Sequence, residues 1–172
     1  RYVNGEVSRI SPEAPVPVIR VREEKSVAGG AANVALNLAS LGASVESVGW
    51  FGKDEQGDEL VEILCEKNIK VDPRCRFSSA PTISKSRITS SNQQVCRVDR
   101  ESNADSYSLG LDQFGSLLLE KAGNADAVII SDYGKGFVTN EALEVLKSSA
   151  RFLAVDPKPS RPVDYACPDL LT

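Results

Sequence analysis

The sequence predicts an α/β fold built on a mostly parallel sheet, with a small projecting β element. From Gly29 onward, strand-like and helix-like segments alternate, as they do in layered α/β proteins. Residues 127–131 form a continuous apolar run, which is typical of a parallel strand buried on both faces. Two alternating runs, 82–89 and 93–99, flank Ser90-Ser91-Asn92 and predict a hairpin inserted between the α/β units.

Length and charge narrow the class of protein. The 172 residues suffice for one domain with a core, and 20 basic against 24 acidic residues give a net charge of −4. Without a basic block, we expect neither nucleic acid nor an anionic membrane to be the main partner. No apolar run reaches the length of a membrane span and no signal peptide is recognisable, so we expect a cytoplasmic protein.

Three residue types are informative by their number. Four cysteines are scattered without C-x-x-C spacing and are interpreted as reduced thiols: Cys65, Cys75, Cys96 and Cys167. The chain has no His, which excludes an imidazole base. It also has no Met, so we interpret it as an excerpt of a longer protein.

The N-terminal part is expected to be extended. Residues 1–9 are polar, with Asn4-Gly5 as a turn signal. Three prolines between residues 11 and 17 exclude a helix, and residues 16–27 are expected to form a strand that suits an edge or a projecting ribbon.

Residues 28–52 predict a helix followed by a strand. The apolar positions expected to form its buried face are Ala31, Val34, Ala35, Leu38 and Leu41. Gly42 is placed to end this helix, and residues 45–50 alternate as a short strand does.

The remaining segments continue the alternation. Three helices are predicted over 54–67, 112–122 and 139–150, the first capped by Asp54 and the third by Thr139. Their expected inward residues are Leu60, Ile63, Leu64, Leu111, Phe114, Leu118, Leu143, Leu146 and Ala150. Strands are predicted over 69–77, 152–155 and 170–172.

The glycine pair at the start of the first helix is the first candidate binding element. Gly29 and Gly30 allow close approach of a ligand to the backbone, near the unpaired N–H groups of the first turn. Asn33 adds a polar side chain at the same opening. The alternative is a tight turn entering a packing helix. A dinucleotide fingerprint fits poorly, because the G-x-G-x-x-G spacing is missing.

Two loops follow predicted strands, where ligands of parallel sheets bind. The first, Ser131-Asp132-Tyr133-Gly134-Lys135-Gly136, places Asp132 and Lys135 near a strand end, with Lys135 as a point charge for an anion. The second, Asp156-Pro157-Lys158, has the same placement. Either loop is equally well interpreted as a polar connection.

The predicted hairpin carries a cluster of cations with one carboxylate: Lys85, Arg87, Arg97, Arg100 and Asp99. Lys85 and Arg87 share one face, and so do Arg97 and Asp99. Such a face could bind a phosphorylated polyol, because Arg side chains bind phosphate and an Asp carboxylate accepts hydrogen bonds from hydroxyls. The alternative is a solvated edge whose charges discourage aggregation.

The glycine pair also carries a resemblance. The spacing Gly29-Gly30-Ala31-x-Asn33-x-Ala35, six residues, Gly42, nine residues, Gly52 resembles the first signature of the ribokinase-like carbohydrate kinases. In that family the Gly-Gly backbone and the Asn hold sugar hydroxyls. The resemblance therefore implies substrate-binding roles for Gly29, Gly30 and Asn33.

Further segments narrow the resemblance: RISPEAPVPV, QQVCRVDRE, SDYGKG and VDPK are similar to the D-glycero-β-D-manno-heptose-7-phosphate kinase branch, the kinase half of bifunctional ADP-heptose synthases. This implies phosphorylation of the heptose 7-phosphate at its anomeric hydroxyl with ATP and Mg²⁺, for the inner core of lipopolysaccharide. It also implies a nucleotide-side role for Asp156 and Lys158. A homodimer is expected through a β lid made of residues 14–27 and 82–99.

The chain departs from the family at both ends. The strand that normally ends in a sugar-binding Asp is absent, and the Asn-x-x-Glu and Gly-Ala-Gly-Asp motifs are expected beyond Thr172. We therefore expect a single truncated kinase domain over 1–172 that lacks the C-terminal part of the fold. It has no nameable catalytic or metal-binding residue and no turnover by itself. Two alternatives stay open: another sugar kinase of the same fold, or a non-catalytic sugar-phosphate-binding module.

Overall fold

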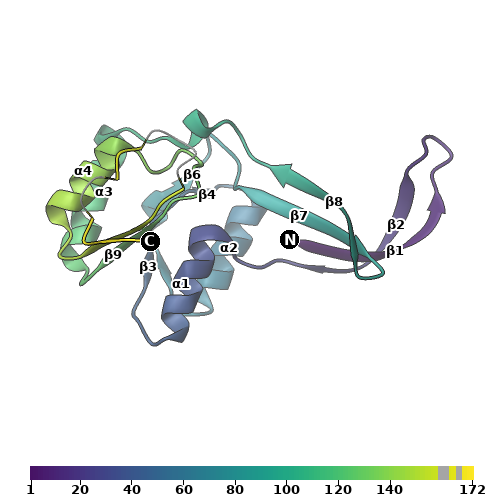
Figure 1. Cartoon of the computed structure of the whole chain (residues 1–172), viewed down its shortest axis with the longest axis horizontal. Coiled ribbons are helices and arrows are strands. Elements are labelled where there is room, and N and C mark those ends of the chain that lie inside the picture. Colours follow the sequence, from purple (N-terminus) through teal and green to yellow (C-terminus); the bar gives the residue numbers. More distant parts are fainter. Residues whose placement is uncertain (159–162, 166–167) are drawn as a thin grey trace.

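The chain combines an α/β body with a long projecting sheet (Figure 1). The computed structural model describes residues 1–158, 163–165 and 168–172. Cys167 lies outside these residues. The body contains the helices and the short parallel strands, and the projecting sheet, called the lid here, is an extended four-stranded arm. This division confirms the predicted α/β class with a projecting β element.

The lid consists of β1 (Tyr2–Ile10), β2 (Pro17–Lys25), β7 (Ser84–Ser90) and β8 (Gln93–Arg100), in the order β2-β1-β7-β8. Strand β1 is antiparallel to β2 and parallel to β7, and β7 is antiparallel to β8. The hairpin prediction is confirmed. Its turn residues Ser91 and Asn92 have φ of 50° and 64°, the left-handed conformation of tight hairpin turns.

The turn predicted at Asn4-Gly5 was wrong, because β1 is a continuous inner strand of the lid. The Asn4-Gly5 pair, taken as a turn, lies at a register shift between β1 and β2. Gly5 is buried, and a Cβ there would lie 2.5 Å from the carbonyl oxygen of Arg20. The glycine therefore allows a β-bulge in a continuing strand instead of a chain reversal.

The body strands are β3 (Glu46–Ser47), β4 (Phe51–Gly52), β5 (Lys70–Val71), β6 (Arg76–Phe77), β9 (Val128–Ser131), β10 (Leu153–Asp156) and β11 (Leu170–Leu171). The ladders β3–β5, β4–β6 and β11–β10–β9 are all parallel. The prediction of single strands over 45–50 and 69–77 was wrong. A 3₁₀ turn at Pro73–Cys75, where proline fixes φ, interrupts the second segment.

The helices are α1 (Gly30–Ser40), α2 (Glu55–Cys65), α3 (Leu111–Asn124) and α4 (Asn140–Ser149). A short 3₁₀ helix spans Ala104–Tyr107. Both predicted caps are confirmed. The N–H of Gly57 donates to Oδ1 of Asp54 at 2.8 Å, and the N–H of Ala142 donates to Oγ1 of Thr139 at 3.2 Å. These side chains satisfy first-turn N–H groups that lack helical partners.

The buried face of α1 differs from the prediction. Ala32 and Ala35 are buried with Leu36 packed beside them, whereas Ala31 is exposed and Leu41 is 84% exposed. Apolar residues surround most of this helix, so their spacing fits two neighbouring faces equally well. Packing against the rest of the body selects one of them.

The core divides into two clusters of buried residues. The larger comprises Ala28, Ala32, Ala35, Phe51, Leu64, Ile69, Cys75, Phe114, Leu117 and Leu118. The smaller comprises Ile130, Leu143, Leu153 and Val155. Strand β9 was expected to be buried on both faces, but Ile129 is 45% exposed and Ile130 6% exposed, so only one face of this strand is covered. Leu111 is also exposed, contrary to expectation, at the start of α3.

Candidate functional site

The glycine pair lies at the start of α1. Gly29 precedes the helix in an extended conformation, and no side chain of the described residues caps the first turn. Gly30 has φ of 53°, a conformation that strains any residue with a side chain. Asn33 is exposed in this first turn. The N–H groups of the turn and the Asn33 amide are therefore available to a ligand.

The loop after β9 lies against this opening. The ring of Tyr133 is 3.5 Å from the position that a Cβ on Gly30 would take. Gly134 and Gly136 have φ of 64° and 102°, and the N–H of Gly134 donates to Oδ1 of Asp132 at 2.7 Å. These features fix the loop so that an exposed aromatic ring forms one wall of the opening. The sequence analysis had not assigned a role to Tyr133.

The two predicted strand-end loops are neighbours. The N–H of Asp132 donates to the carbonyl oxygen of Asp156 at 2.9 Å, across the ends of β9 and β10. Asp132 is 7% exposed, and its carboxylate also accepts from the hydroxyl of Tyr165. Asp156 and Lys158 are exposed. Asp132 is therefore tied into the loop structure, whereas Asp156 remains accessible.

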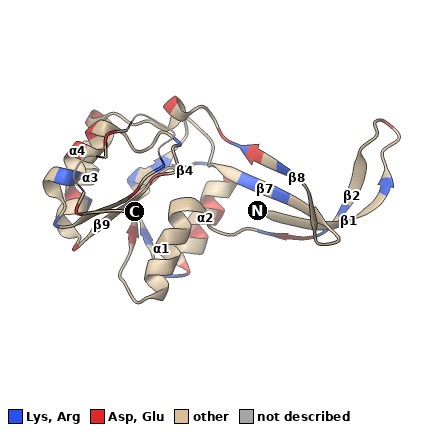
Figure 2. Ribbon diagram, in the orientation of Figure 1, with Lys and Arg blue, Asp and Glu red and all other residues tan. Residues whose placement is uncertain are grey.

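The predicted charged face of the lid is present. Strand register pairs Lys85 with Asp99 and Arg87 with Arg97, so all four side chains leave the same face of the sheet. Figure 2 shows charged residues of both signs along β7 and β8. Asp99 accepts from Lys85 Nζ at 2.7 Å and from Arg97 Nε at 2.8 Å. Hydrogen bonds from Lys85 and then Arg97 lower the pKa of Asp99. Arg100 lies on the other face, where it donates to Gln56.

Arg87 differs from its neighbours. Its guanidinium carbon lies 5.7 Å from the centroid of the Tyr2 ring, and no carboxylate forms an ion pair with it within the described residues. Arg97, a second cation, lies directly opposite Arg87 on the neighbouring strand β8. Like charges opposite one another destabilise a sheet, and an anion between them removes that repulsion. This pair is the part of the face best suited to a phosphate.

Glu101 completes the site and was missed by the sequence analysis. Both of its carboxylate oxygens accept from Lys135 Nζ, at 2.8 and 2.6 Å. The hydrogen bond from Lys135 lowers the pKa of Glu101, so the carboxylate stays ionised. The alternation of Arg97, Asp99 and Glu101 at every second residue was a signal that could have included it. Through this contact the lid meets the loop after β9.

A buried polar contact attaches the lid to the body. Thr82, at the root of β7, donates from N and Oγ1 to Asp54 at 2.8 and 2.6 Å, and its Oγ1 accepts from the N–H of Gly52. Burial acts to raise the pKa of Asp54, but the bonds from Thr82 and Gly57 lower it. A Cβ on Gly57 would lie 2.0 Å from the carbonyl oxygen of Gly52. Gly52 and Gly57 thus permit the close approach that this attachment needs.

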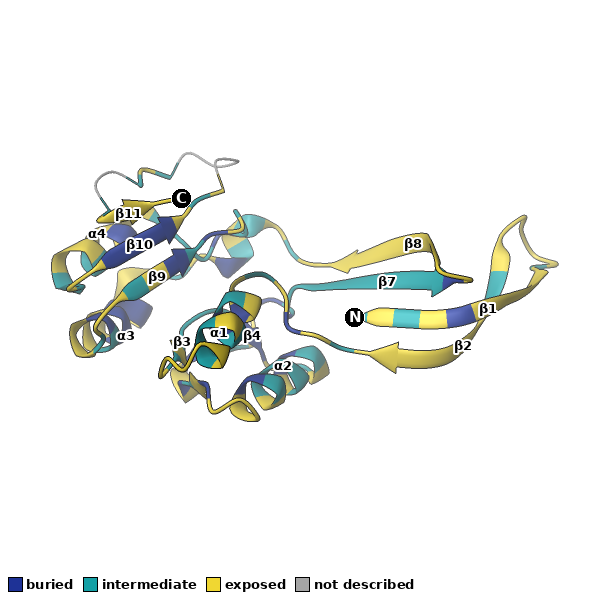
Figure 3. Ribbon diagram, turned by 60° about the horizontal axis from the view of Figure 1, so that its bottom comes forward, coloured by how far each residue is buried: buried dark blue, intermediate teal, exposed yellow. Residues whose placement is uncertain are grey.

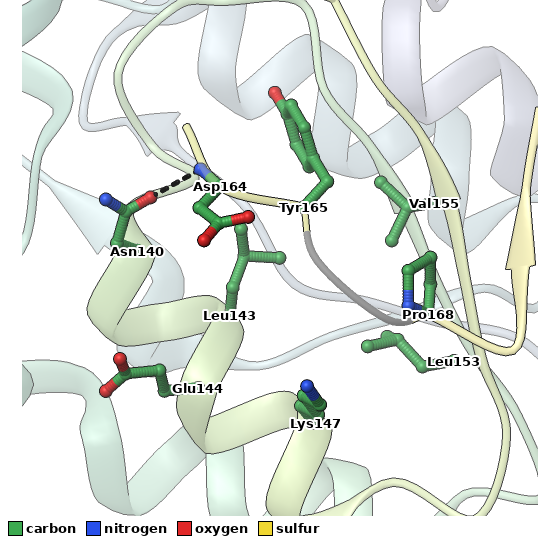
Figure 4. Close-up of a pocket in the computed structure, with 9 residues that line it drawn as sticks. All are labelled: Asn140, Leu143, Glu144, Lys147, Leu153, Val155, Asp164, Tyr165 and Pro168. Atoms are coloured by element: carbon green, nitrogen blue, oxygen red, sulfur yellow. Dashed lines mark hydrogen bonds between the residues drawn. The ribbon is translucent and has the colours of Figure 1, made fainter. Parts of the chain in front are cut away.

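The candidate site is an open face rather than an enclosed pocket. A groove of about 210 Å³ lies between α4, β10 and nearby residues (Figure 4): Asn140, Leu143, Glu144, Lys147, Leu153, Val155, Asp164, Tyr165 and Pro168. A more open concavity of about 480 Å³ lies on the lid beside Ser8, Arg9, Val18 and Arg20. None of the predicted site residues lines either of these two hollows.

Neither a cluster of metal ligands nor a membrane-spanning helix is found in the part of the chain that the structure describes. No group of three His, Cys, Asp or Glu residues there could hold a metal ion. None of the helices there has the length and the apolar character that a membrane span requires.

The family model "pfkB family carbohydrate kinase" matches residues 1–172, the whole chain. The chain belongs to this family. A similar curated protein is the Bifunctional protein HldE of Pseudomonas paraeruginosa, 45% identical over 92% of this chain and 33% of its own length. The Bifunctional protein HldE of Coxiella burnetii (strain RSA 331 / Henzerling II) is 42% identical over 100% of this chain and 36% of its own length. The chain thus spans about a third of the length of these pfkB relatives.

A solved structure agrees with the pfkB fold. The carbohydrate kinase from Agrobacterium tumefaciens superposes with a TM-score of 0.68 at 19% identity, over 91% of this chain and 50% of that one. At this identity the likeness concerns the fold alone. The resemblance to ribokinase-like carbohydrate kinases is therefore confirmed as membership of the family.

Proposed function

We propose that this chain is the sugar-binding part of an ATP-dependent kinase that phosphorylates D-glycero-D-manno-heptose 7-phosphate at the anomeric hydroxyl. The reaction would supply ADP-heptose for the lipopolysaccharide inner core, in the cytoplasm. The observation that carries the proposal is the charged lid face. Lys85, Arg87 and Arg97 stand together on it, and Lys85 is connected through Glu101 to the loop beside the glycine pair. The similarity to HldE proteins over nearly the whole chain supports it.

In this proposal each part of the site meets one part of the substrate. The backbone at Gly29 and Gly30 and the amide of Asn33 bind sugar hydroxyls, since the helix start offers unpaired N–H groups. Arg87 and Arg97 bind the 7-phosphate, because guanidinium groups pair well with phosphate oxygens. Asp99, already held by Lys85 and Arg97, is placed to accept from a hydroxyl.

The loops carry the remaining roles. Lys135 was expected to contact an anion directly, but its Nζ is held by Glu101, so we assign it an anchoring role. Asp132 shapes the loop, and Asp156 and Lys158 face the nucleotide side at the next strand end. When bound, ATP with Mg²⁺ supplies the phosphoryl group. The described residues fit the sugar side of the reaction, and no group of three His, Cys, Asp or Glu among them could hold the metal ion.

The functional assay is coupled ADP release by the product of the complete gene. Heptose 7-phosphate should be turned over. Unphosphorylated heptose should be a poor substrate, because it has no phosphate to bind Arg87 and Arg97. Efficient turnover of the unphosphorylated sugar would favour the alternative of another kinase of this fold. Tight binding of heptose 7-phosphate without ADP release would favour a non-catalytic module.

Arg97→Ala tests the assignment of the lid face. Arg97 is about half exposed, so we expect a rise in KM for heptose 7-phosphate of about tenfold, with KM for ATP little changed. The matched control is Arg20→Ala, which removes an exposed lid arginine outside the charged cluster. Equal losses for both substrates would contradict the role of Arg97 on the sugar side.

The chain of 172 residues is expected to be inactive by itself. The family's base and phosphate cradle are expected outside it, and both are needed to transfer a phosphoryl group. The same coupled assay, run beside the product of the complete gene, measures this. Turnover by the chain at about a hundredth of that rate would contradict the expectation and would make Asp132 the first residue to test as the base.

We further propose a homodimer formed through the lid. The face opposite the charges carries apolar side chains: Val3, Val7, Val21, Ile88 and Val98. Several are exposed, and among the residues that the structure describes no cluster of buried apolar side chains lies within the lid. A second copy of the same face would cover them, because a C₂ interface joins identical, self-complementary patches.

A further inference from the structure

Glu101 lies immediately after β8, where the lid returns to the body. Its carboxylate binds Lys135 Nζ through both oxygens, and its Oε2 lies 3.8 Å from Lys85 Nζ. Lys85 belongs to β7 of the lid, whereas Lys135 belongs to the loop whose Tyr133 contacts Gly30. One carboxylate therefore lies between a cation of the lid and a cation of the body.

The charges around Glu101 alternate in sign. Moving from the lid to the body, the ion pairs connect Arg97, Asp99, Lys85, Glu101 and Lys135. With Arg87 included, four cations face two carboxylates, which leaves a net charge of +2. A phosphomonoester carries a charge of about −1.5 to −2 near pH 7, so the excess of the face matches a phosphorylated sugar.

Without the carboxylate, Lys85 and Lys135 would repel each other across the junction. The lid would stay attached, because Thr82 and Asp54 hold the root of β7 through partly buried hydrogen bonds. The loop after β9 would lose this ion pair with the lid, and the position of Tyr133 beside the glycine pair would depend on contacts within the loop alone. Loss of Glu101 thus changes the alignment of two halves of the site and leaves the fold in place.

We propose that Glu101 is a positioning residue for the anionic substrate, holding Lys85 and Lys135 so that the charged lid face and the glycine pair meet the same molecule. The proposal rests on the proposed function and deepens it. Because Glu101 occupies Lys135, the phosphate is left to Arg87 and Arg97. The chemical class recognised is a phosphomonoester of a polyol.

The test is Glu101→Gln in the product of the complete gene. The amide keeps the shape but removes the charge, and we expect KM for heptose 7-phosphate to rise about tenfold while KM for ATP stays close to its original value. Binding of inorganic phosphate, titrated directly, should weaken by a similar factor. The matched control is Glu120→Gln, which removes a carboxylate that binds Arg74 on the body, away from the lid junction.

Three outcomes would overturn the proposal: unchanged kinetics, equal losses for sugar and ATP, or a lower KM for the sugar phosphate, which would make Glu101 a competitor of the substrate. A double-mutant cycle adds a stricter readout. If Glu101 acts through Lys135, combining Glu101→Gln with Lys135→Gln should be no worse than the worse single variant, and additive losses would contradict this. Absence of turnover in the unmodified protein would instead refute the proposed function, and the titration with inorganic phosphate would still decide the role of Glu101.

Discussion

The body and the lid are stabilised in different ways. The body buries two apolar clusters between helices and parallel strands, with Leu64 completely buried. The lid is a single four-stranded layer, held by strand pairing and ion pairs, and valines such as Val98 remain largely exposed (Figure 3). Since a sheet needs a covered apolar face to be stable, the comparison indicates that the body has an apolar core of its own, whereas the lid depends on contacts at its faces.

The largest expected effect separates the core of the body from the exposed apolar face of the lid. Leu64→Ala should destabilise the protein by about 2–5 kcal/mol, because it opens a cavity in the body. Val98→Ala, the matched truncation on the lid, removes a side chain that is 55% exposed and should cost far less. Chemical denaturation of both variants measures the difference. Equal costs would show that the lid has a core of its own.

The next comparison concerns ion pairs in the body. Asp72 is nearly buried and accepts from Nε and Nη2 of Arg74 at 2.9 and 2.8 Å, with Lys121 at 3.1 Å. The hydrogen bonds from Arg74 hold the pKa of Asp72 well below its usual range. Asp72→Asn should therefore cost about 1–3 kcal/mol near neutral pH, since it weakens hydrogen bonds to charged groups.

The pH dependence follows from the direction of that shift. A carboxyl with a lowered pKa in the folded state stabilises the protein above its ordinary value of 3.8, and this contribution is lost as the pH falls below it. The melting temperature should thus decrease as the pH is lowered below about 4. The fall should be shallower in Asp72→Asn than in the unmodified protein. Parallel curves would show that Asp72 does not carry the acid sensitivity.

The proposed dimer gives the third comparison. Val98→Glu should weaken self-association by about tenfold or more, because it places a charge in an apolar contact. Leu41→Glu, on an exposed position of α1, is the control and should leave association unchanged. Sedimentation at micromolar concentrations measures both. A monomeric unmodified protein, or equal effects of the two variants, would contradict a dimer through the lid.

The smallest expected effect is that of removing an exposed ion pair from the lid. Arg22 and Glu6 form an exposed pair, with side chains 59% and 61% accessible. Glu6→Gln should leave the midpoint of chemical denaturation close to that of the unmodified protein, since exposed pairs are screened by solvent. The same denaturation experiment allows the change in stability of Glu6→Gln to be compared with that of Asp72→Asn. A loss as large as that of Asp72→Asn would remove the distinction between body and lid.

Local signals in the sequence determined much of this protein. Asp54 and Thr139 cap their helices as predicted, and Ser91 and Asn92 make the hairpin turn, because these features depend on residues a few positions apart. Side-chain alternation likewise placed Lys85 beside Arg87 on one face of the lid.

Tertiary structure decided what depends on distant partners. Strand β1 lies in the middle of the lid because it pairs with β7, far along the chain, and no local pattern encodes such a pairing. The buried face of α1 was chosen by packing, since the helix is apolar on neighbouring faces. Glu101 became part of the site through Lys135, and Tyr133 through Gly30. A single sequence reveals which residues can bind or pack, and only the folded chain brings the distant ones together.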